Sequence, residues 1–359
     1  DKTDVDDLMQ EAEGMLFEVS QRNLKKDVTQ INPVIAEARN RMLLAATKQG
    51  ASGVPSGFHS LDKITSGWQR SDLIIIAARP AMGKTAFILS MAKNMAVDYN
   101  SPVAVFSLEM SNVQLVNRLI MNVCQLEGEK IKNGQLDKYE WEKFDKDINL
   151  LLDAPIYVDD TPSLSIFELR SKARRLVKEH KIQCIIIDYL QLMNASGMSF
   201  GSREQEVSII SRSLKGLAKE LDIPIIALSQ LNRGVEGRTG IEGKRPQLSD
   251  LRESGAIEQD ADMVCFIHRP EYYKITEDAH GNSLLGIAEI IVAKHRNGAT
   301  ADVQLKFKNT YAKFMNKDDM ADDDNPFGSE FQIISSKMND NAGDAYPAIG
   351  PNSIPPGGQ

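Results

Sequence analysis

Short apolar segments alternate with helical patterns through the middle of the chain. The apolar segments are rich in branched residues and nearly free of polar ones, which favours strands that are buried on both faces. The stretches between most of them repeat apolar residues at helical spacing. This rhythm predicts an α/β fold in which helices cover both faces of a mainly parallel sheet. The expected strands are 73–77, 103–107, 156–158, 184–187, 224–229 and 263–268, and the expected helices include 85–95, 113–126, 165–180 and 204–221.

The pattern changes in the C-terminal third of the chain. Two β-rich segments, 287–295 and 300–307, flank the turn Arg296-Asn297-Gly298-Ala299. Asn-Gly between two such segments is a strong hairpin signal, so we expect a β-hairpin there. From residue 316 onward the chain is rich in Asp, then in Gly, Pro and Asn, which predicts a disordered tail over 316–359 apart from the apolar patch Phe327–Ile334.

The N-terminal 23 residues contain a short amphipathic helical pattern between Asp6 and Val19. Nothing nearby in sequence offers a surface for it, so it either folds back onto its own domain or docks on another subunit. A second helical pattern runs from Pro33 to about Lys48 and is followed by a Gly- and Ser-rich loop, which is typical of a domain boundary. We therefore divide the chain into a docking helix, a connecting helix with linker, a main domain and a tail. Their ranges are 1–23, 24–52, 53–315 and 316–359.

Composition limits the class of protein. Of the 359 residues, 42% are hydrophobic and 26% are charged, as in ordinary globular proteins. No apolar stretch has the length of a membrane span and the start has no secretory pattern, so we expect a cytoplasmic protein without a membrane partner. The three cysteines have no paired spacing, which argues against a disulfide or zinc framework.

The formal net charge of −8 argues against nucleic acid only at first sight. The acidic residues are concentrated in 1–23 and 316–359, so the segment between has a small net positive charge. A nucleic-acid surface confined to a few loops is compatible with this distribution, whereas a uniformly basic groove is not.

The strongest chemical signal is the loop that follows the first expected strand. A buried strand, a Gly-Lys-Thr turn and a helix together form a phosphate cradle, in which backbone N–H groups and the helix dipole face anionic oxygens. Lys84 then adds charge to the phosphates and Thr85 adds a hydroxyl for Mg²⁺. Taken alone, the tripeptide is equally compatible with an ordinary surface helix start. The candidate nucleotide-binding residues are Ala78, Arg79, Pro80, Ala81, Met82, Gly83, Lys84 and Thr85.

Polar residues end three other expected strands, and carboxyl ends of parallel strands meet at one edge of a sheet. Asp188 is placed to hold the Mg²⁺ shell, although an Asp there is often a helix cap. Glu109 is a candidate base for orienting water, or equally a solvated loop acid. Gln230 suits a sensor of the γ-phosphate, although a strand-end Gln is more often a surface residue.

Two further segments carry candidate chemistry away from this loop. Lys294 and Arg296 come at the hairpin turn, where a projecting Arg can stabilise transition-state charge in a neighbouring subunit or simply be solvated. The segment Ser249–Gly255 is a loop that can track a phosphodiester strand through an Arg and free amides, and Arg203 can join it.

Six ordered segments closely resemble the motifs of the DnaB family of bacterial replicative helicases. The resemblance covers roughly residues 53–314, and the family has Ala or Gly at the first position of the phosphate loop, where this chain has Ala78. The departures are His295 in place of the usual Gln, and Ala299-Thr300 after the turn. The segments are Ala78–Thr85, Phe106–Met110, Ile185–Gln191, Ala227–Leu231, Ser249–Gly255 and Lys294–Gly298.

The resemblance implies a RecA-like P-loop ATPase that forms a homohexamer around single-stranded DNA, with ATP and Mg²⁺ at each subunit interface. It further implies 5′→3′ translocation, docking of the Asp6–Val19 linker helix on an adjacent subunit, and primase and a helicase loader as partners of the full-length protein. The N-terminal collar domain of the family is missing, so we expect a motor fragment. The alternatives are a RecA-like recombinase or regulatory ATPase, and a ring scaffold that binds ATP without hydrolysing it.

The same resemblance implies a role for each candidate residue. Lys84 and Thr85 would hold phosphate and Mg²⁺, and Asp188 would support the metal. Glu109 would activate water, and Gln230 would couple the γ-phosphate to DNA. Lys294 and Arg296 would reach the nucleotide of the neighbouring subunit. The residues that match the DNA-contacting loop of the family are Arg252, Glu253 and Gly255.

Overall fold

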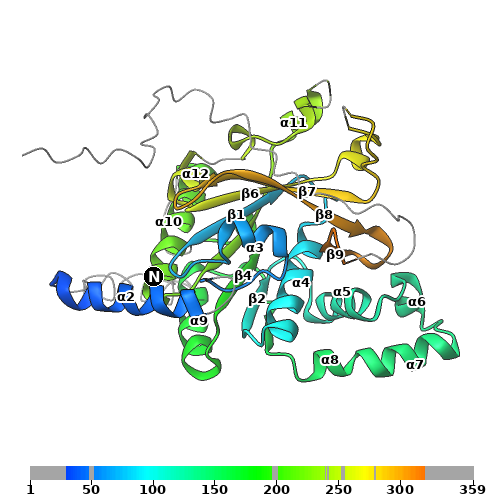
Figure 1. The fold of residues 1–359 in the computed structure, drawn as a ribbon, viewed down its shortest axis with the longest axis horizontal. Helices are drawn as coiled ribbons and strands as arrows, with labels where there is room; N and C mark the ends of the chain where they lie inside the picture. Colours follow the sequence, from blue (N-terminus) through cyan, green and yellow to red (C-terminus); the bar gives the residue numbers. More distant parts are fainter. Residues whose placement is uncertain are drawn as a thin grey trace, which may run out of the picture.

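A single mixed sheet organises the domain in the computed structural model (Figure 1). The structure describes residues 30–47, 52–195, 201–238, 240, 242–251, 255–278 and 280–319. Within these residues the strand order is β3-β2-β4-β5-β1-β6-β7-β8-β9, in which the strands from β3 to β6 pair in parallel and those from β6 to β9 pair antiparallel. The strands are β1 Leu73–Ala78, β2 Val103–Ser107, β3 Ile156–Asp159, β4 Cys184–Asp188, β5 Ile225–Gln230, β6 Met263–His268, β7 Ile287–His295, β8 Ala301–Lys308 and β9 Lys313–Asn316.

The central strand β1 explains why its sequence is almost continuously apolar. It pairs with β5 on one side and β6 on the other, and every residue in it is buried. Because successive side chains point to opposite faces, Ile74 and Ile76 enter one hydrophobic core while Leu73, Ile75 and Ala77 enter the other. A strand with a core on each face has no position for a polar side chain until it ends.

Helices cover the two faces of the sheet, as the sequence predicts. Helices α3, α4 and α5 contribute to the core that contains Ile74, whereas α9, α10 and α12 contribute to the core that contains Ile75. Helices α6 to α8 extend away from the sheet beyond α5 (lower right in Figure 1). The α-helices are α2 Ile31–Thr47, α3 His59–Thr65, α4 Lys84–Lys93, α5 Asn112–Cys124, α6 Gly128–Asn133, α7 Lys138–Asp147, α8 Asn149–Leu152, α9 Ile166–His180, α10 Arg203–Leu221, α11 Gly234–Gly237 and α12 Gly255–Asp260.

The six expected parallel strands, the four expected helices and the hairpin are all present. The short strand β9 and the helices α6 to α8 were not predicted, because they lack a continuous apolar run or a wide apolar stripe. Phe314 shows what β9 contributes: its ring packs at 5.3 Å from Phe87 of α4 and at 4.7 Å from Phe307 of β8. This aromatic contact closes the antiparallel end of the sheet over α4.

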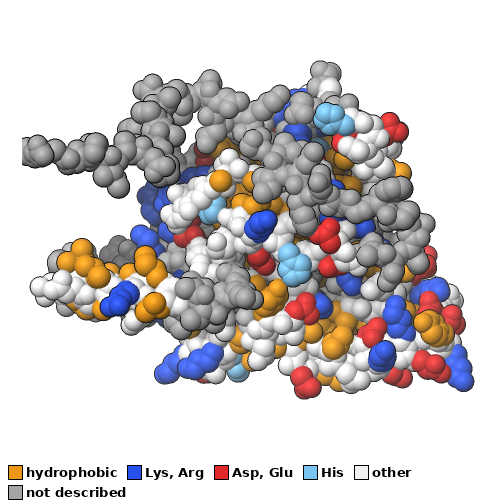
Figure 2. Space-filling view, in the orientation of Figure 1, with side chains coloured by type: hydrophobic (Ala, Val, Ile, Leu, Met, Phe, Trp, Pro, Cys, Tyr) orange, Lys and Arg blue, Asp and Glu red, His pale blue; other side chains and the backbone are white. Residues whose placement is uncertain are grey.

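The two ends of the chain differ in what the structure describes. The predicted helix at Asp6–Val19 and nearly all of the predicted tail lie outside the described residues. The second helical pattern is present as α2, which carries several exposed apolar side chains (left in Figure 2). These side chains are Ile31, Val34, Ile35, Met42 and Leu43. Among the described residues, no helix combines the length and apolar character that a membrane crossing needs.

Candidate active site

The predicted phosphate loop is a tight turn between β1 and α4. Gly83 immediately precedes α4 with a φ of 92°, and Ala81 also has a positive φ of 64°. This conformation turns the buried strand directly into a helix whose first residue is Lys84. The N-terminus of α4 therefore faces the carboxyl edge of the sheet, with its unpaired N–H groups and its dipole directed toward any anion there.

A cavity of about 630 Å³ lies at this edge and gathers the predicted site residues. Lys84, Thr85, Glu109, Asp188 and Gln230 come from the ends of four different strands, and all five line it. The volume is within the range of small-molecule sites. The other lining residues are Pro80, Ala81, Gly83, Ala86, Arg118, Met121, Tyr189, Arg269, Phe307, Asn309 and Ala312.

Thr85 and Asp188 form the most informative contact in this cavity. The Thr85 hydroxyl donates a hydrogen bond of 2.8 Å to Oδ2 of Asp188, which is only 2% exposed. Burial raises the pKa of the Asp188 carboxyl, and the hydrogen bond from Thr85 opposes that rise. A hydroxyl beside a carboxylate at a helix N-terminus presents the hard oxygen ligands that Mg²⁺ prefers, so these residues fit a magnesium site.

Lys84 is partly buried beside Asp188. Its ammonium group donates to the carbonyl oxygen of Ala78 at 3.2 Å. Burial lowers the pKa of this lysine, while the nearby carboxylates of Asp188 and Glu109 act in the opposite direction. A cation that water solvates poorly interacts more strongly with an anionic ligand than a surface lysine does.

Glu109 and Gln230 complete the set from the neighbouring strands. Glu109 is exposed just beyond the end of β2, and Gln230 is the last residue of β5, paired in register with Ala78. The backbone N–H of Gln230 donates to the side chain of Gln191 at 3.4 Å, and the Gln191 amide donates to Ser229 at 2.9 Å. The Gln191 side chain thus braces the end of β5 beside the cavity.

Three residues of the predicted loop do not line the cavity. Ala78 and Met82 are buried in the core, and the buried Arg79 side chain contacts the segment after β5. Arg79 forms hydrogen bonds of 2.9 and 2.6 Å to Glu236 and of 2.9 Å to the carbonyl oxygen of Leu231. Its side chain therefore anchors the segment after β5.

Arg118, Tyr189 and Arg269 line the cavity but were not predicted. The Arg269 guanidinium lies 4.1 Å from the centre of the Phe307 ring and donates to the Ala81 carbonyl oxygen at 3.4 Å. Arg118 belongs to α5, whose apolar spacing identifies the helix but says nothing about which polar residue faces the cavity. Arg269 and Tyr189 had a usable signal, because they directly follow strands β6 and β4, as other site residues follow theirs.

Lys294 and Arg296 lie at the opposite edge of the sheet from this cavity. β7 runs antiparallel to β6, so Lys294 pairs with Val264 near the start of β6, and the neighbouring Met263 aligns with Ile74 near the start of β1. The phosphate loop follows the other end of β1, about 17 Å away along the strand. Lys294 and Arg296 thus lie at the end of the sheet opposite the cavity of the same chain. This position agrees with side chains that point away from their own chain's cavity.

The predicted DNA-contacting residues are only partly within the described structure. Arg252 and Glu253 lie outside the described residues, whereas Gly255 begins α12. Arg203 begins α10, forms an ion pair with Glu206, and donates to the carbonyl oxygens of Gln191 at 2.6 Å and Met193 at 3.0 Å. Arg203 is therefore held against the segment that also braces Gln230.

Substituting Gly83 tests the conformation of the loop. A Cβ at this position would meet Phe314 at 3.2 Å and the φ is positive, so Gly83→Ala should lower the free energy of unfolding by about 1–2 kcal/mol. It should also weaken nucleotide binding, because a relaxed loop redirects the N–H groups. Urea unfolding and titration with a fluorescent ATP analogue measure the two effects.

Gly216 is the matched control, because it lies inside α10 and a Cβ added there would have no atom within 4 Å. Gly216→Ala should raise the free energy of unfolding by about 0.5–1 kcal/mol, since alanine is the better helix former. Wild-type stability and nucleotide affinity in Gly83→Ala would contradict the strained-turn interpretation.

Comparison with known proteins decides the family. The model of the DnaB-like helicase C terminal domain matches residues 53–316. The chain belongs to this family. It is 46% identical over 314 residues to the replicative DNA helicase DnaB of Geobacillus stearothermophilus, which covers 87% of this chain and 67% of that protein. It is 45% identical over 322 residues to the replicative DNA helicase DnaC of Bacillus subtilis, covering 89% of this chain and 69% of the relative.

Solved structures agree with this assignment of the helicase domain. A structure described as a DnaB-like replicative helicase and its interactions with primase superposes with a TM-score of 0.70 and 38% identity, over 86% of this chain and 71% of that chain. A solved ATPase domain gives a TM-score of 0.73 and 38% identity, over 81% of this chain and 99% of that domain. The RecA-like α/β fold and the resemblance predicted from the sequence are confirmed. The chain is a replicative DNA helicase motor, an ATP-dependent hydrolase, which sets aside the recombinase and scaffold alternatives.

Proposed function

We propose that this motor works as a ring-shaped homohexamer, with ATP and Mg²⁺ bound between subunits, and moves 5′→3′ along single-stranded DNA. The proposal rests on one observation: the predicted site residues lie in two groups, at opposite edges of the sheet. The cavity contains Lys84, Thr85, Asp188 and Glu109, whereas Lys294 and Arg296 lie about a strand length away. A head-to-tail ring would bring the hairpin of one copy to the cavity of the next.

The residues of the cavity that the sequence predicted each have a role in this proposal. Lys84 and the N-terminus of α4 bind the phosphates, and Thr85 with Asp188 holds the metal. Bound Mg²⁺ would neutralise phosphate charge and favour departure of the γ-phosphoryl group. Glu109, exposed on the cavity side of β2, orients the attacking water and accepts its proton. Lys294 and Arg296 of the neighbouring copy stabilise the charge that develops on the transferred group.

Gln230 is placed to connect the nucleotide with the DNA-contacting loop. The next residue, Leu231, forms an antiparallel bridge with Leu251, and Asn232 donates to the carbonyl oxygen of Asp250 at 2.9 Å. A shift of Gln230 toward a γ-phosphate would therefore act on the chain that leads into Arg252, Glu253 and Gly255. Contacts of this loop with the DNA backbone convert hydrolysis into movement without reading the bases.

The proposed partners follow from the same family assignment. The Asp6–Val19 helix docks on an adjacent subunit, and primase and a loader meet the full-length protein, which acts in the cytoplasm where bacterial DNA is copied. Support comes from the sequence resemblance and from a solved relative described with primase.

Mixing two inactive variants tests the shared site. Lys84→Ala removes the phosphate cation of the cavity, and Arg296→Ala removes the projecting cation, so kcat for ATP should fall by about 10² or more in each alone, to a low but measurable residual rate. In rings formed from equal amounts of both, about a quarter of the interfaces pair an intact cavity with an intact hairpin, and ATPase activity should return at those interfaces. A mixture as inactive as its components would overturn the proposal, as would a growing filament instead of a closed hexamer in light scattering with ATP and single-stranded DNA.

A further inference from the structure

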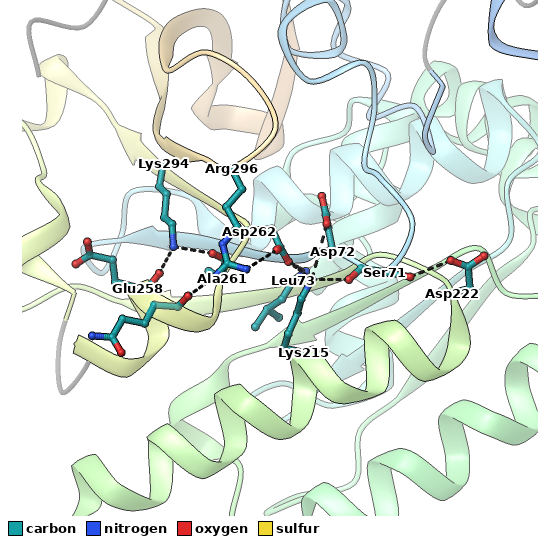
Figure 3. Close-up of polar contacts among 11 residues, drawn as sticks. Ser71, Asp72, Leu73, Lys215, Asp222, Glu258, Ala261, Asp262, Lys294 and Arg296 are labelled. Carbon is teal, nitrogen blue, oxygen red and sulfur yellow. Dashed lines mark hydrogen bonds and ion pairs between the residues drawn. The ribbon is translucent and has the colours of Figure 1, made fainter. Parts of the chain in front are cut away.

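Lys294 and Arg296 are held in place by the end of α12. Lys294 donates to the carbonyl oxygens of Glu258 and Ala261, the latter at 2.8 Å (Figure 3). Arg296 donates to the carbonyl oxygen of Gln259 at 2.5 Å. The last carbonyl groups of a helix lack partners within the helix and carry the negative end of its dipole. The backbone carbonyl groups at the end of α12 thus accept hydrogen bonds from both cations.

Asp262, just after α12, connects the end of this helix to the sheet. Its carboxylate lies 3.3 Å from Nη1 of Arg296, accepts a hydrogen bond from Lys215 of α10, and accepts the backbone N–H of Leu73 at 2.8 Å (Figure 3). Its own backbone carbonyl accepts the N–H of Arg296 at 2.9 Å. Asp262 is 5% exposed, whereas the Arg296 side chain is 48% exposed. A rigid buried carboxylate therefore holds one end of a side chain that otherwise projects into solvent.

A bulge in β7 brings the two cations to the same place. Val264 pairs with Lys294 but the next residue, Cys265, pairs with Val292, so Ala293 is the extra residue. Bulges redirect the side chains that follow them. Both cations then lie over α12 beside Asp262 (Figure 3).

We propose that Asp262 is a positioning residue for hydrolysis in the neighbouring subunit: it fixes Arg296 in the direction from which the guanidinium meets the neighbour's nucleotide. An Arg has five N–H donors. The contacts with Asp262 and Gln259 involve Nη1 and Nη2, which leaves other donors for a phosphate oxygen. Fixing the side chain beforehand removes rotamer freedom that would otherwise be lost in the transition state.

The surrounding charges favour this role for Asp262. Asp72 and Asp262 face Lys215 and Arg296, so the cluster has two carboxylates and two cations. Burial, with the adjacent Asp262 carboxylate, raises the pKa of Asp72 to about 6, and Lys215 and Arg296 oppose the rise. The two cations thus offset the negative charge of the two buried carboxylates. This attraction holds Arg296 against α12.

Asp262→Asn is the direct test, because asparagine keeps the shape and an acceptor for Leu73 but loses the charge. This inference rests on the proposed intersubunit site. We expect kcat for ATP to fall about tenfold with little change in KM, since the variant's own cavity is untouched. Glu220→Gln, which removes an ion-paired carboxylate from the same helix as Lys215, should leave kcat and KM unchanged.

Mixed rings then distinguish positioning from a structural role. If Asp262 acts through the hairpin, mixing Asp262→Asn with Lys84→Ala should raise ATPase activity several-fold above the mean of the two separate proteins. If the substitution damages its own cavity or fold, the mixture gains nothing. Arg296→Ala mixed with Lys84→Ala is the reference: recovery there without recovery for Asp262→Asn overturns this inference alone, and no recovery in either mixture overturns the shared site as well.

A double variant gives a second measurement that does not depend on ring mixing. Once Arg296 is Ala, Asp262→Asn should lower kcat no further, because the group that Asp262 positions is gone. A further tenfold loss in the double variant would show that Asp262 acts elsewhere and would overturn the inference.

Discussion

Lys84→Ala should lower kcat for ATP hydrolysis by at least about 10² and abolish unwinding of a forked duplex. Lys84 is the only lysine among the residues that line the described cavity, and it lies near the carboxylates of Asp188 and Glu109. Its loss removes a cation that no neighbouring side chain can replace in the same place. The free energy of unfolding should not fall in this variant. Burial lowers the pKa of Lys84, so keeping this side chain charged in the folded protein costs free energy.

The control for Lys84 is Lys93, at the other end of the same helix. Lys93 pairs with Asp98 at 3.0 Å on the surface, and surface pairs contribute little, so Lys93→Ala should leave hydrolysis within about twofold. Steady-state ATPase assays and unwinding of duplexes with a 5′ or a 3′ single-stranded tail measure both variants. Unwinding by Lys84→Ala would contradict the phosphate assignment, and preference of the wild type for the 3′ tail would contradict 5′→3′ movement.

Glu109→Gln should lower kcat by about 10²–10⁴ while the affinity for ATP stays within about threefold. Glutamine keeps the size of the side chain and its ability to accept a hydrogen bond from water, but it cannot take the proton. Phosphate binding depends on Lys84 and the loop, which this change does not touch. The expected result is a protein that binds ATP and fails to turn it over.

Single-turnover hydrolysis and binding of a fluorescent ATP analogue separate these two quantities. Glu129→Gln, an exposed acid in the first turn of α6, is the matched control and should match the wild type. An unchanged rate in Glu109→Gln would restore the alternative left open by the sequence, in which Glu109 is a solvated loop acid.

Residue patterns predicted the part of the fold that depends on burial and local geometry. Continuous apolar segments such as Leu73–Ala78 can be strands only if helices cover both faces, and Gly83 marks the turn where a left-handed φ is needed. Parallel strands end at a common edge, so Glu109, Asp188 and Gln230 could be assigned to one site before their distances were known. The cavity that all three share with Lys84 follows from that rule.

Other members of the site could not be predicted from local pattern. Arg118 lies on an amphipathic helix, where several polar residues are equally compatible with the helical period. The Arg269 guanidinium, directly after β6, lies 4.1 Å from the ring centre of Phe307 in β8, although the two residues are far apart in sequence. Such contacts are set by strand order and by packing between elements distant in sequence, which a local pattern does not encode.

The sequence by itself determined the set of candidate groups: a predicted phosphate loop, a candidate metal-binding carboxylate, a candidate base, and two cations at a hairpin turn. Only the tertiary structure decided how these groups are divided between the edges of the sheet. β6 runs parallel to β1 and β7 runs antiparallel to β6, so the chain returns Lys294 and Arg296 to the amino edge while Lys84 stays at the carboxyl edge. The physical reason is that the direction and neighbours of a strand depend on nonlocal pairing, whereas the groups that bind phosphate are specified residue by residue.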